Sequence, residues 1–371
     1  MYTYLPKQRF MLIGVYPKYF TTEDMLADLK EMEMLVKTYG GEVCALSVQK
    51  GESPSQSTYL RSGKAQNAAD LIEKEKIDVV VAKDNLKSGQ LFTLEKIFQR
   101  SNEKIIVWDK IFLILRIFDL HADTAEANLQ IKIASLKHLG PRIYGMGYQL
   151  SQQGTGVGSK GQGETNTEVM KRHWRNEIWM IKKKIKELEK TRMQQIERRK
   201  RMNIKSVSLV GYTNSGKTSL FNKLTLKNQF VANRLFATLD SHTAKLYLEG
   251  LKREVILTDT IGFIRNLPAF LIDSFKSTLL ESVNCDLIIH LVDASDPEME
   301  IKIRTVGKIL EELNLLEKKN IFVFNKVDLL KYENLERLKI EYQNISPLFI
   351  SAQSGSGLKE LLQTIEEKLL N

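Results

Sequence analysis

The chain has 371 residues, 43% of them hydrophobic and 27% charged, with a formal net charge of +10; this composition is typical of globular proteins and excludes a disordered or fibrous chain. The length predicts two or three structural units, and the two cysteines, Cys44 and Cys285, exclude a disulfide-rich secreted scaffold. No apolar run approaches the ~18 residues of a membrane span and the first residues lack the pattern of a secretory signal, so we expect a cytoplasmic protein without a membrane segment.

Residues 1–118 predict a small α/β unit, because strand-like apolar runs alternate with stretches of helical spacing. The strand-like runs are 10–16, 42–48, 78–82 and 104–108, and the helical stretches are 22–38, 65–72 and 89–98. The polar stretch 50–64 interrupts this pattern, and we expect a loop there. It contains Arg61-Ser62-Gly63-Lys64, which is too short a signal for a phosphate site and which we interpret as a surface turn.

Residues 119–204 predict a helical linker. Residues 122–139 have apolar residues at helical spacing, and we expect Gly140-Pro141 to end this helix. Thr165-x-x-Glu168 fits a capping box that begins a second helix. The second helix has apolar residues at steps of four and three, a heptad-like seam that predicts antiparallel packing against the first. The seam consists of Trp174, Ile178, Ile181, Ile185 and Leu188.

A glycine-rich stretch, residues 152–163, separates the two helices. It contains Gly156-x-Gly158-x-x-Gly161, which is the spelling of a dinucleotide fingerprint. That fingerprint requires a preceding strand within a βαβ unit. Because a helix precedes it here, we reject the dinucleotide interpretation and expect a loop that carries Lys160.

The positive charge is concentrated in the second helix. Residues 171–205 carry eight lysines and six arginines against four glutamates, which equals the net charge of the whole chain. Such a segment attracts polyanions, because binding releases the counterions condensed on a phosphate backbone. Taken alone, the segment fits a solvated helix face equally well, and an acidic membrane surface is a weaker third interpretation.

Residues 205–371 alternate again between strands and helices. The apolar run 206–210 leads into G-x-x-x-x-G-K-[ST], and a helical stretch follows at 219–226. In this context the glycines let backbone N–H groups surround phosphate, and the helix N-terminus adds its positive end. We expect Lys217 to reach the β- and γ-phosphates and the Thr218 hydroxyl to bind Mg²⁺. The motif comprises Gly211, Tyr212, Thr213, Asn214, Ser215, Gly216, Lys217 and Thr218.

A downstream motif selects the base. A strand at 321–324 ends in Asn325-Lys326-Val327-Asp328. The Asp328 carboxylate can accept hydrogen bonds from both N1–H and the N2 amine of guanine, a donor pair that adenine lacks. We expect Lys326 to lie over the base and Asn325 to tie this loop to the phosphate loop. Ser351-Ala352-Gln353, which follows another short strand, is placed to contact the base through backbone N–H groups.

Two further positions lie between these motifs. A strand at 255–258 ends at Asp259-Thr260-Ile261-Gly262, where we expect Asp259 to hold a Mg²⁺-bound water and the Gly262 N–H to meet the γ-phosphate. Phe236-Ala237-Thr238-Leu239-Asp240 lies in a polar stretch after the first helix. Thr238 is our candidate for a second hydroxyl ligand of Mg²⁺, and Thr225 and Thr243 compete with it.

In this order, the motifs resemble the five ordered motifs of translation-factor-class GTPases. Phe236–Asp240 and Asp259–Ile264 narrow the resemblance to the Obg/HflX group, and residues 140–168, with Gly161-Gln162-Gly163-Glu164-Thr165, resemble the linker of HflX proteins. The resemblance implies a P-loop GTPase domain with a mostly parallel sheet and helices on both faces, in an α/β protein. It also implies hydrolysis of GTP to GDP and phosphate, and association with the large (50S) ribosomal subunit in ribosome splitting, rescue or protein synthesis under stress.

The resemblance and the charge together favour ribosomal RNA as the partner of residues 150–205. We expect a monomer with three parts: an N-terminal α/β domain (1–118), a helical linker (119–204) and a GTPase domain (205–371). Two alternatives remain open. One is a ribosome-assembly GTPase, and the other is an RNA-binding scaffold in which the nucleotide only switches the conformation.

The catalytic residues expected at the reacting phosphate are Lys217, Thr238 and Gly262. Phe263 stands where GTPases usually place a water-positioning side chain, and phenylalanine cannot orient water by hydrogen bonding. We therefore expect hydrolysis to be slow in isolation and stimulated by the ribosome. Asn214 resembles the position that helps to hold potassium in some related GTPases, and we hypothesise that K⁺ stimulates turnover.

Overall fold

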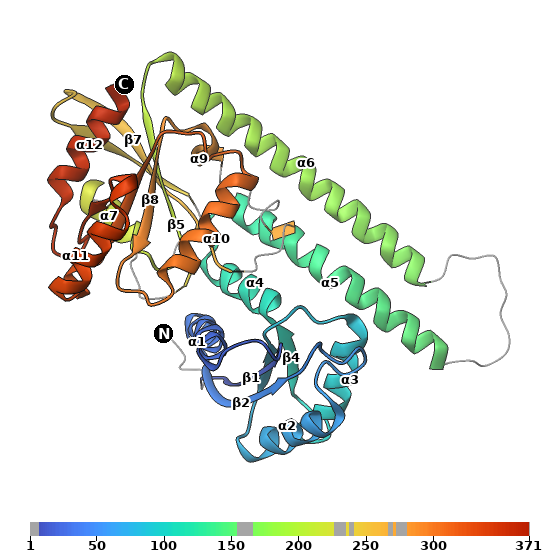
Figure 1. Cartoon of the computed structure of the whole chain (residues 1–371). Coiled ribbons are helices and arrows are strands. Elements are labelled where there is room, and N and C mark those ends of the chain that lie inside the picture. The colour runs from blue at the N-terminus through green and yellow to red at the C-terminus, as the bar shows by residue number, and fades with distance from the viewer. Residues whose placement is uncertain are drawn as a thin grey trace. The chain divides into compact units, whose positions relative to one another are not determined.

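The computed structural model describes residues 7–153, 166–225, 235–236, 241–265, 270–271 and 280–370 (Figure 1). The chain divides into two compact units. The first comprises residues 1–120 and 131–183, and the second comprises residues 121–130 and 184–371. Each unit contains one sheet and its own hydrophobic core.

The first unit is built on a four-stranded parallel sheet in the order β2-β1-β3-β4, which confirms the predicted small α/β unit. Four helices accompany the sheet. The strands are β1 (Arg9–Tyr16), β2 (Glu42–Lys50), β3 (Val79–Ala82) and β4 (Ile106–Asp109), and the helices are α1 (Thr22–Tyr39), α2 (Ser62–Lys74), α3 (Ser88–Phe98) and α4 (Lys110–His121).

Both faces of this sheet are covered, which explains the continuous apolar run of β1. Met11 and Ile13 belong to a buried cluster with residues of α2 and α3. Phe10, on the opposite face of the strand, contacts Tyr39 at the end of α1, with 5.9 Å between the ring centroids. The capping box of Thr21 begins α1, and Gly40 ends it with a φ of 104°.

Two features of this unit differ from the sequence-based expectation. Ser62 begins α2, so the expected loop is shorter and Arg61-Ser62-Gly63-Lys64 forms the first turn of a helix, not a surface turn. The helix α4 was not expected. Its buried residues lie on nearly every side, because the sequence KIFLILRIF is apolar almost all round. Such a helix shows no hydrophobic periodicity.

Two long helices, α5 (Ala125–Gln153) and α6 (Asn166–Arg201), follow α4. The prediction that Gly140-Pro141 ends the first of them was wrong, since α5 continues to Gln153. A proline inside a helix removes one hydrogen bond and costs about 3 kcal/mol, which a cooperative helix with intact turns on both sides can sustain. The glycine-rich residues 154–165 lie outside the described residues, as does Thr165 of the expected capping box.

The seam predicted for α6 is fully buried only at its middle, and the contact line shifts away from it further along. Ile181 is buried, whereas Leu188 is 37% exposed and Ile196, beyond the predicted seam, is 4% exposed. A straight helix drifts by about 20° per heptad from an ideal seven-residue repeat, which carries the contact line away from Leu188.

Ion pairs flank the contact line of α6. In the first unit Lys132 pairs with Glu177 at 2.7 Å, and in the second Glu126 pairs with Arg192 at 2.9 Å. The earlier residue of α5 pairs with the later residue of α6, as expected for antiparallel helices. Near its end α6 is tied to α9 (Leu280–Asn284), because Arg199 Nη2 donates to both carboxylate oxygens of Glu281 at 2.6 and 2.9 Å.

The second unit has a six-stranded sheet in the order β10-β9-β8-β5-β7-β6, in which only β6 runs antiparallel to its neighbour. This mostly parallel sheet confirms the predicted fold class. Its strands are β5 (Ser206–Gly211), β6 (His242–Leu248), β7 (Arg253–Asp259), β8 (Leu287–Asp293), β9 (Asn320–Asn325) and β10 (Leu348–Phe349). Its other helices are α7 (Lys217–Thr225), α10 (Met299–Glu312), η1 (Val327–Leu329), α11 (Tyr332–Glu341), η2 (Gln343–Ile345) and α12 (Leu358–Leu370).

Four parallel strands of this sheet end at the same edge. Gly211 ends β5, Asp259 ends β7, Asp293 ends β8 and Asn325 ends β9. The registers align these ends, since Leu209 lies opposite Asp259 and Asp293 lies opposite Asn325. The carboxyl ends of parallel strands are where ligands bind in open α/β sheets.

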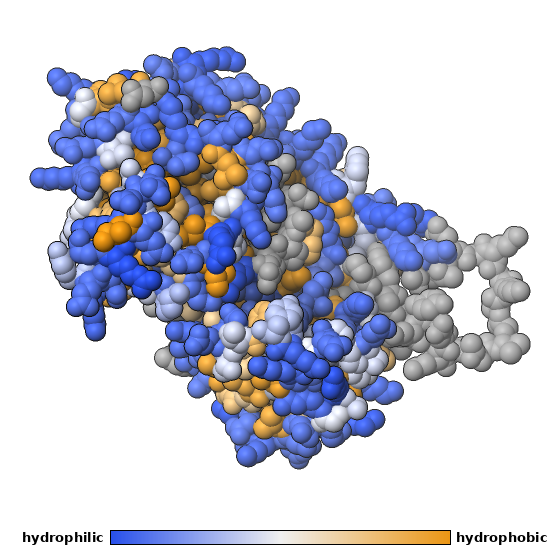
Figure 2. Space-filling view, in the orientation of Figure 1, coloured by the Kyte–Doolittle hydropathy of each residue, from blue (hydrophilic) through white to orange (hydrophobic). Residues whose placement is uncertain are grey.

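The surface adds two observations. On the face shown in Figure 2, α6 is covered mostly by hydrophilic residues. No helix in the described part of the chain has both the length and the apolar character required of a membrane-spanning segment.

Candidate nucleotide-binding site

The loop between β5 and α7 makes a tight turn of backbone. Gly216 has a φ of 94° and Asn214 a φ of 64°, both in the left-handed region that glycine and asparagine tolerate best. A side chain at Gly216 would place its Cβ 2.2 Å from Asn325 Nδ2, so only glycine fits there. The loop thus has the tight backbone that its sequence pattern predicts.

Lys217, the first residue of α7, is buried and folded back on the loop. Its Nζ donates to the carbonyl oxygens of Gly211 at 3.1 Å and Tyr212 at 2.8 Å. Burial lowers the pKa of Lys217 to about 8, and the negative charge of Asp259 acts in the opposite direction. The ammonium group therefore remains mainly charged at pH 7, close to the position expected for a phosphate.

Thr218 and Asp259 lie beside this lysine as a hydrogen-bonded pair of oxygen-bearing side chains. Thr218 Oγ1 donates to Asp259 Oδ2 at 2.7 Å, and Asp259 is fully buried. Hydroxyl and carboxylate oxygens are ligands that suit Mg²⁺. Within the described residues no group of three or more His, Cys, Asp or Glu side chains could hold a metal. A Mg²⁺ ion at this pair would therefore share its coordination with phosphate and water, as the chemistry of phosphoryl transfer requires.

The segment after β7 lies directly against the phosphate loop. Thr213 N–H donates to the Phe263 carbonyl at 2.8 Å, and Phe263 N–H donates to the Gly211 carbonyl at 3.1 Å. Thr260 ties the segment to β5 through a hydrogen bond from its Oγ1 to the Leu209 carbonyl at 2.6 Å. Phe263 is 4% exposed, so its ring belongs to the protein interior and not to the site.

Asn325 joins three loops. Its Nδ2 donates to the Ser215 carbonyl at 2.9 Å, which is the tie to the phosphate loop expected from the sequence. Its Oδ1 accepts from the Ala352 N–H at 2.9 Å. The Ser351 N–H donates to the Ser356 carbonyl at 3.0 Å. Two of the three N–H groups expected to face a base are therefore engaged within the protein.

Lys326 and Asp328 complete this end of the site. Lys326 has a φ of 63°, and its Nζ donates to Asp293 Oδ2 at 2.6 Å. Asp328 lies in η1 with its side chain exposed, and Gln353 is exposed as well. The Asp328 carboxylate is therefore accessible to a ligand from solvent.

The structure brings together residues 211–218, 259–262, 325–328 and 351–352 at one sheet edge. Phe236 is buried, but Ala237, Thr238, Leu239 and Asp240 lie outside the described residues, so Thr238 remains a prediction. Of its competitors, Thr225 donates its hydroxyl to the Phe221 carbonyl at 2.7 Å within α7, and Thr243 is exposed on β6.

Sequence reasoning missed three contacts at this edge. Asp293 could have been predicted from the sequence, because a carboxylate at the end of a buried strand is typical of a ligand site. His290 is one of the residues that line a cavity between the phosphate loop and α10. No sequence pattern pointed to it, because it lies within an apolar strand. Its ring packs against that of Phe322, with 4.7 Å between the ring centroids. The third contact, between Tyr212 and Arg265, depends on two loops meeting in space.

Comparison with known proteins gives matches along most of the chain. Residues 27–119 match a family described as GTP-binding GTPase N-terminal, residues 121–199 a GTP-binding GTPase Middle Region, and residues 206–326 a 50S ribosome-binding GTPase. The chain is 40% identical to the GTPase HflX of Caldanaerobacter subterraneus subsp. tengcongensis over 98% of this chain and 81% of that protein.

Two further relatives support the comparison. The GTPase HflX of Escherichia coli K12 is 34% identical over 95% of this chain and 81% of its own length. Among solved structures, the complex of SsGBP with GDP superimposes with a TM-score of 0.52 at 27% identity, covering 97% of this chain and 98% of that one.

Proposed function

The chain belongs to the HflX family of GTPases and is a GTP hydrolase, and from this premise we propose that guanine nucleotide binds at the edge where β5, β7 and β9 end. The observation that carries the proposal is the position of Asn325, which hydrogen-bonds to both the phosphate loop and the loop at 351–352. One buried side chain thereby sets the phosphate end and the base end of the site at a fixed distance.

At the phosphate end, we assign the N–H groups of residues 214–218 to the phosphate oxygens. Lys217 exchanges its two carbonyl partners for β- and γ-phosphate oxygens, which form stronger, charge-assisted hydrogen bonds. Thr218 and, through a water, Asp259 would hold Mg²⁺, with Thr238 as the second hydroxyl. When bound, Mg²⁺ neutralises the charge that develops on the phosphate oxygens.

Hydrolysis requires water to attack the γ-phosphorus while the bond to the β–γ bridging oxygen breaks. Lys217 and the Gly262 N–H stabilise the charge that develops during this step. Phe263, which follows Gly262, is buried and cannot orient the water. We therefore propose that turnover is slow until the ribosome reorders this segment.

At the base end, the Asp328 carboxylate reads guanine and Lys326 covers the base. The direct test is titration calorimetry with GTP, GDP and ATP. We expect GTP and GDP to bind and ATP to bind at least ~10³-fold more weakly, because adenine leaves the carboxylate without its donor pair. Lys217→Ala is the control for the phosphate end. Equal binding of ATP and GTP would contradict the proposal.

We also propose that K⁺ binds beside Asn214 and raises turnover. The left-handed φ of 64° at Asn214 is one that glycine also adopts, so Asn214→Gly removes the side chain without straining the loop. We expect hydrolysis to be faster in K⁺ than in Na⁺ at equal ionic strength, and Asn214→Gly to abolish the difference. Equal rates in the two salts for the unmodified chain would remove this proposal.

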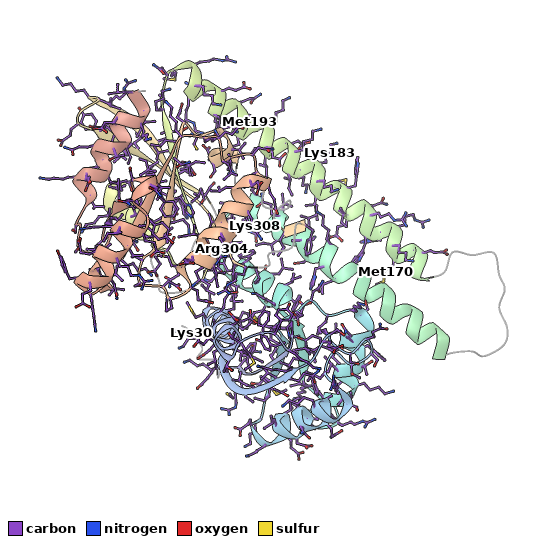
Figure 3. All side chains as sticks on the ribbon, viewed as in Figure 1. Lys30, Met170, Lys183, Met193, Arg304 and Lys308 are labelled. Atoms are coloured by element: carbon purple, nitrogen blue, oxygen red, sulfur yellow. The ribbon has the colours of Figure 1, made fainter. Side chains whose placement is uncertain are left out.

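The proposed partner is the large ribosomal subunit, contacted through ribosomal RNA by residues 150–205 in a cytoplasmic monomer. The match of residues 206–326 to a 50S ribosome-binding GTPase supports it. On α6 the cluster Lys182, Lys183, Lys184 and Lys186 is exposed, and Trp179, 61% exposed, lies beside Lys183. Figure 3 shows Lys183 midway along this helix. Such a cluster suits a phosphate backbone.

Sedimentation with purified large subunits tests this contact. We expect replacement of the four clustered lysines by glutamine to weaken binding and to lower its salt dependence, because fewer counterions are released. The matched control replaces four exposed lysines elsewhere, Lys331, Lys339, Lys359 and Lys368. An equal loss in both variants would mean that only net charge matters and that α6 is not the contact.

For the cellular role, we propose ribosome splitting or rescue under stress, which the family resemblance supports. Light scattering of intact ribosomes with the chain and a GTP analogue tests it, with GDP as the control. A fall in scattering supports splitting. No fall with intact ribosomes, together with tight binding to large-subunit precursors, would favour the assembly role.

A further inference from the structure

We propose that Tyr212 is a positioning residue that holds residues 262–265, here called the strap, across the γ-phosphate position, so that GTP must displace the strap whereas GDP need not. The inference rests on the proposed function in one respect, namely that residues 211–218 receive the β- and γ-phosphates. It concerns the regulation of that site.

The backbone of the strap is paired with the phosphate loop. Phe263 forms a parallel bridge with Tyr212, with hydrogen bonds of 2.8 Å from Thr213 N–H and 3.1 Å to the Gly211 carbonyl. Thr213 belongs to the turn that surrounds phosphate, so its N–H is engaged by the strap in this position.

The end of the strap is held by side chains. Tyr212 Oη accepts a hydrogen bond from the Arg265 N–H at 2.8 Å. The guanidinium group of Arg265 pairs with Glu298, the residue that precedes α10. Lys302 of α10 places its Nζ 5.1 Å from the centroid of the Tyr212 ring. Figure 3 marks α10 by Arg304 and Lys308, which lie further along the same helix.

Tyr212 is suited to this role by its burial. It is 5% exposed, although it is a large side chain in a loop of small residues. Its ring is fixed between the phosphate loop and α10, so the hydroxyl presents one acceptor at a constant place. A phenylalanine would fill the same space without that acceptor.

Gly262 lies close against the phosphate loop and against Lys217, the residues that would flank a γ-phosphate. A Cβ placed on Gly262 would lie 2.8 Å from Thr213 Cα and 3.1 Å from Lys217 Nζ. A phosphate group needs about 2.8 Å between each of its oxygens and a donor on either side. This spacing is short for a phosphate oxygen between the Gly262 N–H and Lys217 Nζ, so in the proposal Gly262 moves away when GTP binds, whereas a β-phosphate within the loop does not reach it.

In the proposal the strap has two positions, and the closed one, which the structure shows, lowers the apparent affinity for GTP in proportion to its population. Removing one hydrogen bond from the closed position shifts such an equilibrium by about two- to tenfold. The direction of this change distinguishes the proposal from a general loss of binding, because loss of the contact is expected to raise the affinity for GTP and not that for GDP.

Tyr212→Phe tests this directly. We expect the ratio of the affinity for a non-hydrolysable GTP analogue to that for GDP to rise about two- to tenfold. Hydrogen exchange should become faster at the Arg265 amide in the nucleotide-free chain. Glu298→Gln, which weakens the second tie of the strap, should shift the ratio in the same direction.

The control is Tyr247→Phe, the same change at an exposed tyrosine of β6. A ratio in Tyr212→Phe that stays at the unmodified value, or that falls, would overturn the proposal. Thermal unfolding of each variant separates loss of folding from loss of the strap. If the unmodified chain bound neither nucleotide, the proposed function itself would fail; binding of both with no shift in the ratio would defeat this inference alone.

Discussion

At the scale of single residues, base selection depends on one exposed carboxylate. For Asp328→Asn we expect GTP affinity to fall by at least ~10²-fold, because an amide can accept only one of the two hydrogen bonds that guanine donates. Xanthosine triphosphate, which offers an acceptor where guanine has its amine, should bind the variant better than GTP does. Competition against a fluorescent GDP derivative measures both effects.

The control for this variant is Asp286→Asn, just before β8, where the carboxylate accepts a hydrogen bond from the Ser206 N–H at the opposite end of the strand from the site. An unchanged preference for guanine in Asp328→Asn would mean that another group reads the base.

His290 gives a pH dependence that originates beneath the phosphate loop. Burial, with a smaller contribution from the charge of Lys217, lowers the pKa of His290 to about 4. The unfolded chain therefore binds more protons than the folded chain between about pH 4 and 6.5, and stability falls as the pH is lowered through this window. From pH 7 to pH 5 the loss from this group is about 2 kcal/mol.

We expect His290→Gln to flatten that part of the stability profile, because glutamine does not titrate. Urea unfolding at pH 7, 6 and 5 measures the free energy of unfolding for both chains. Parallel profiles would show that His290 is not the group responsible.

At the scale of elements, the three loops of the site are held together by Asn325 at the end of β9. For Asn325→Ala we expect a loss of about 2–4 kcal/mol in the free energy of unfolding, because the Ser215 carbonyl and the Ala352 N–H lose their partners in a buried place. Affinity should fall for GDP and GTP alike, since both ends of the site shift.

The matched control is Asn320→Ala, at the exposed start of the same strand. Calorimetric unfolding and GDP binding of the two variants decide the matter, and equal effects at both positions would show that Asn325 has no special role.

The elements also show what a sequence can predict. The strand β1 and the helix α1 were predicted from an apolar run and from helical spacing, because local pattern and burial agree there. The predicted end of α5 at Gly140-Pro141 was wrong, because a proline is a local helix-breaking signal and the turns on both sides of it keep the helix intact. Within the site, the loops at Gly211, Asp259 and Asn325 were predictable because each follows a buried strand. The contact between Tyr212 and Arg265 was not, because no pattern within either loop encodes their meeting.

At the scale of the whole molecule, the buried ring of Phe263 leads us to expect that an outside partner completes the catalytic site. We expect purified large ribosomal subunits to raise steady-state GTP turnover at least ~10-fold over the chain alone. The Lys217→Ala variant with the same subunits controls for contaminating GTPases. Release of phosphate at the same rate with and without subunits would contradict this expectation.

The pair between Arg199 and Glu281 has a practical consequence for anyone who wishes to study the catalytic part in isolation. A fragment cut just before Lys205 would discard Arg199 and leave Glu281, 7% exposed, as an uncompensated carboxylate, a loss of about 3–5 kcal/mol. It would also strip away Ile196, which is buried in the intact chain. A truncation that keeps α6 from Lys184 onward retains both, so recombinant versions should begin there or earlier.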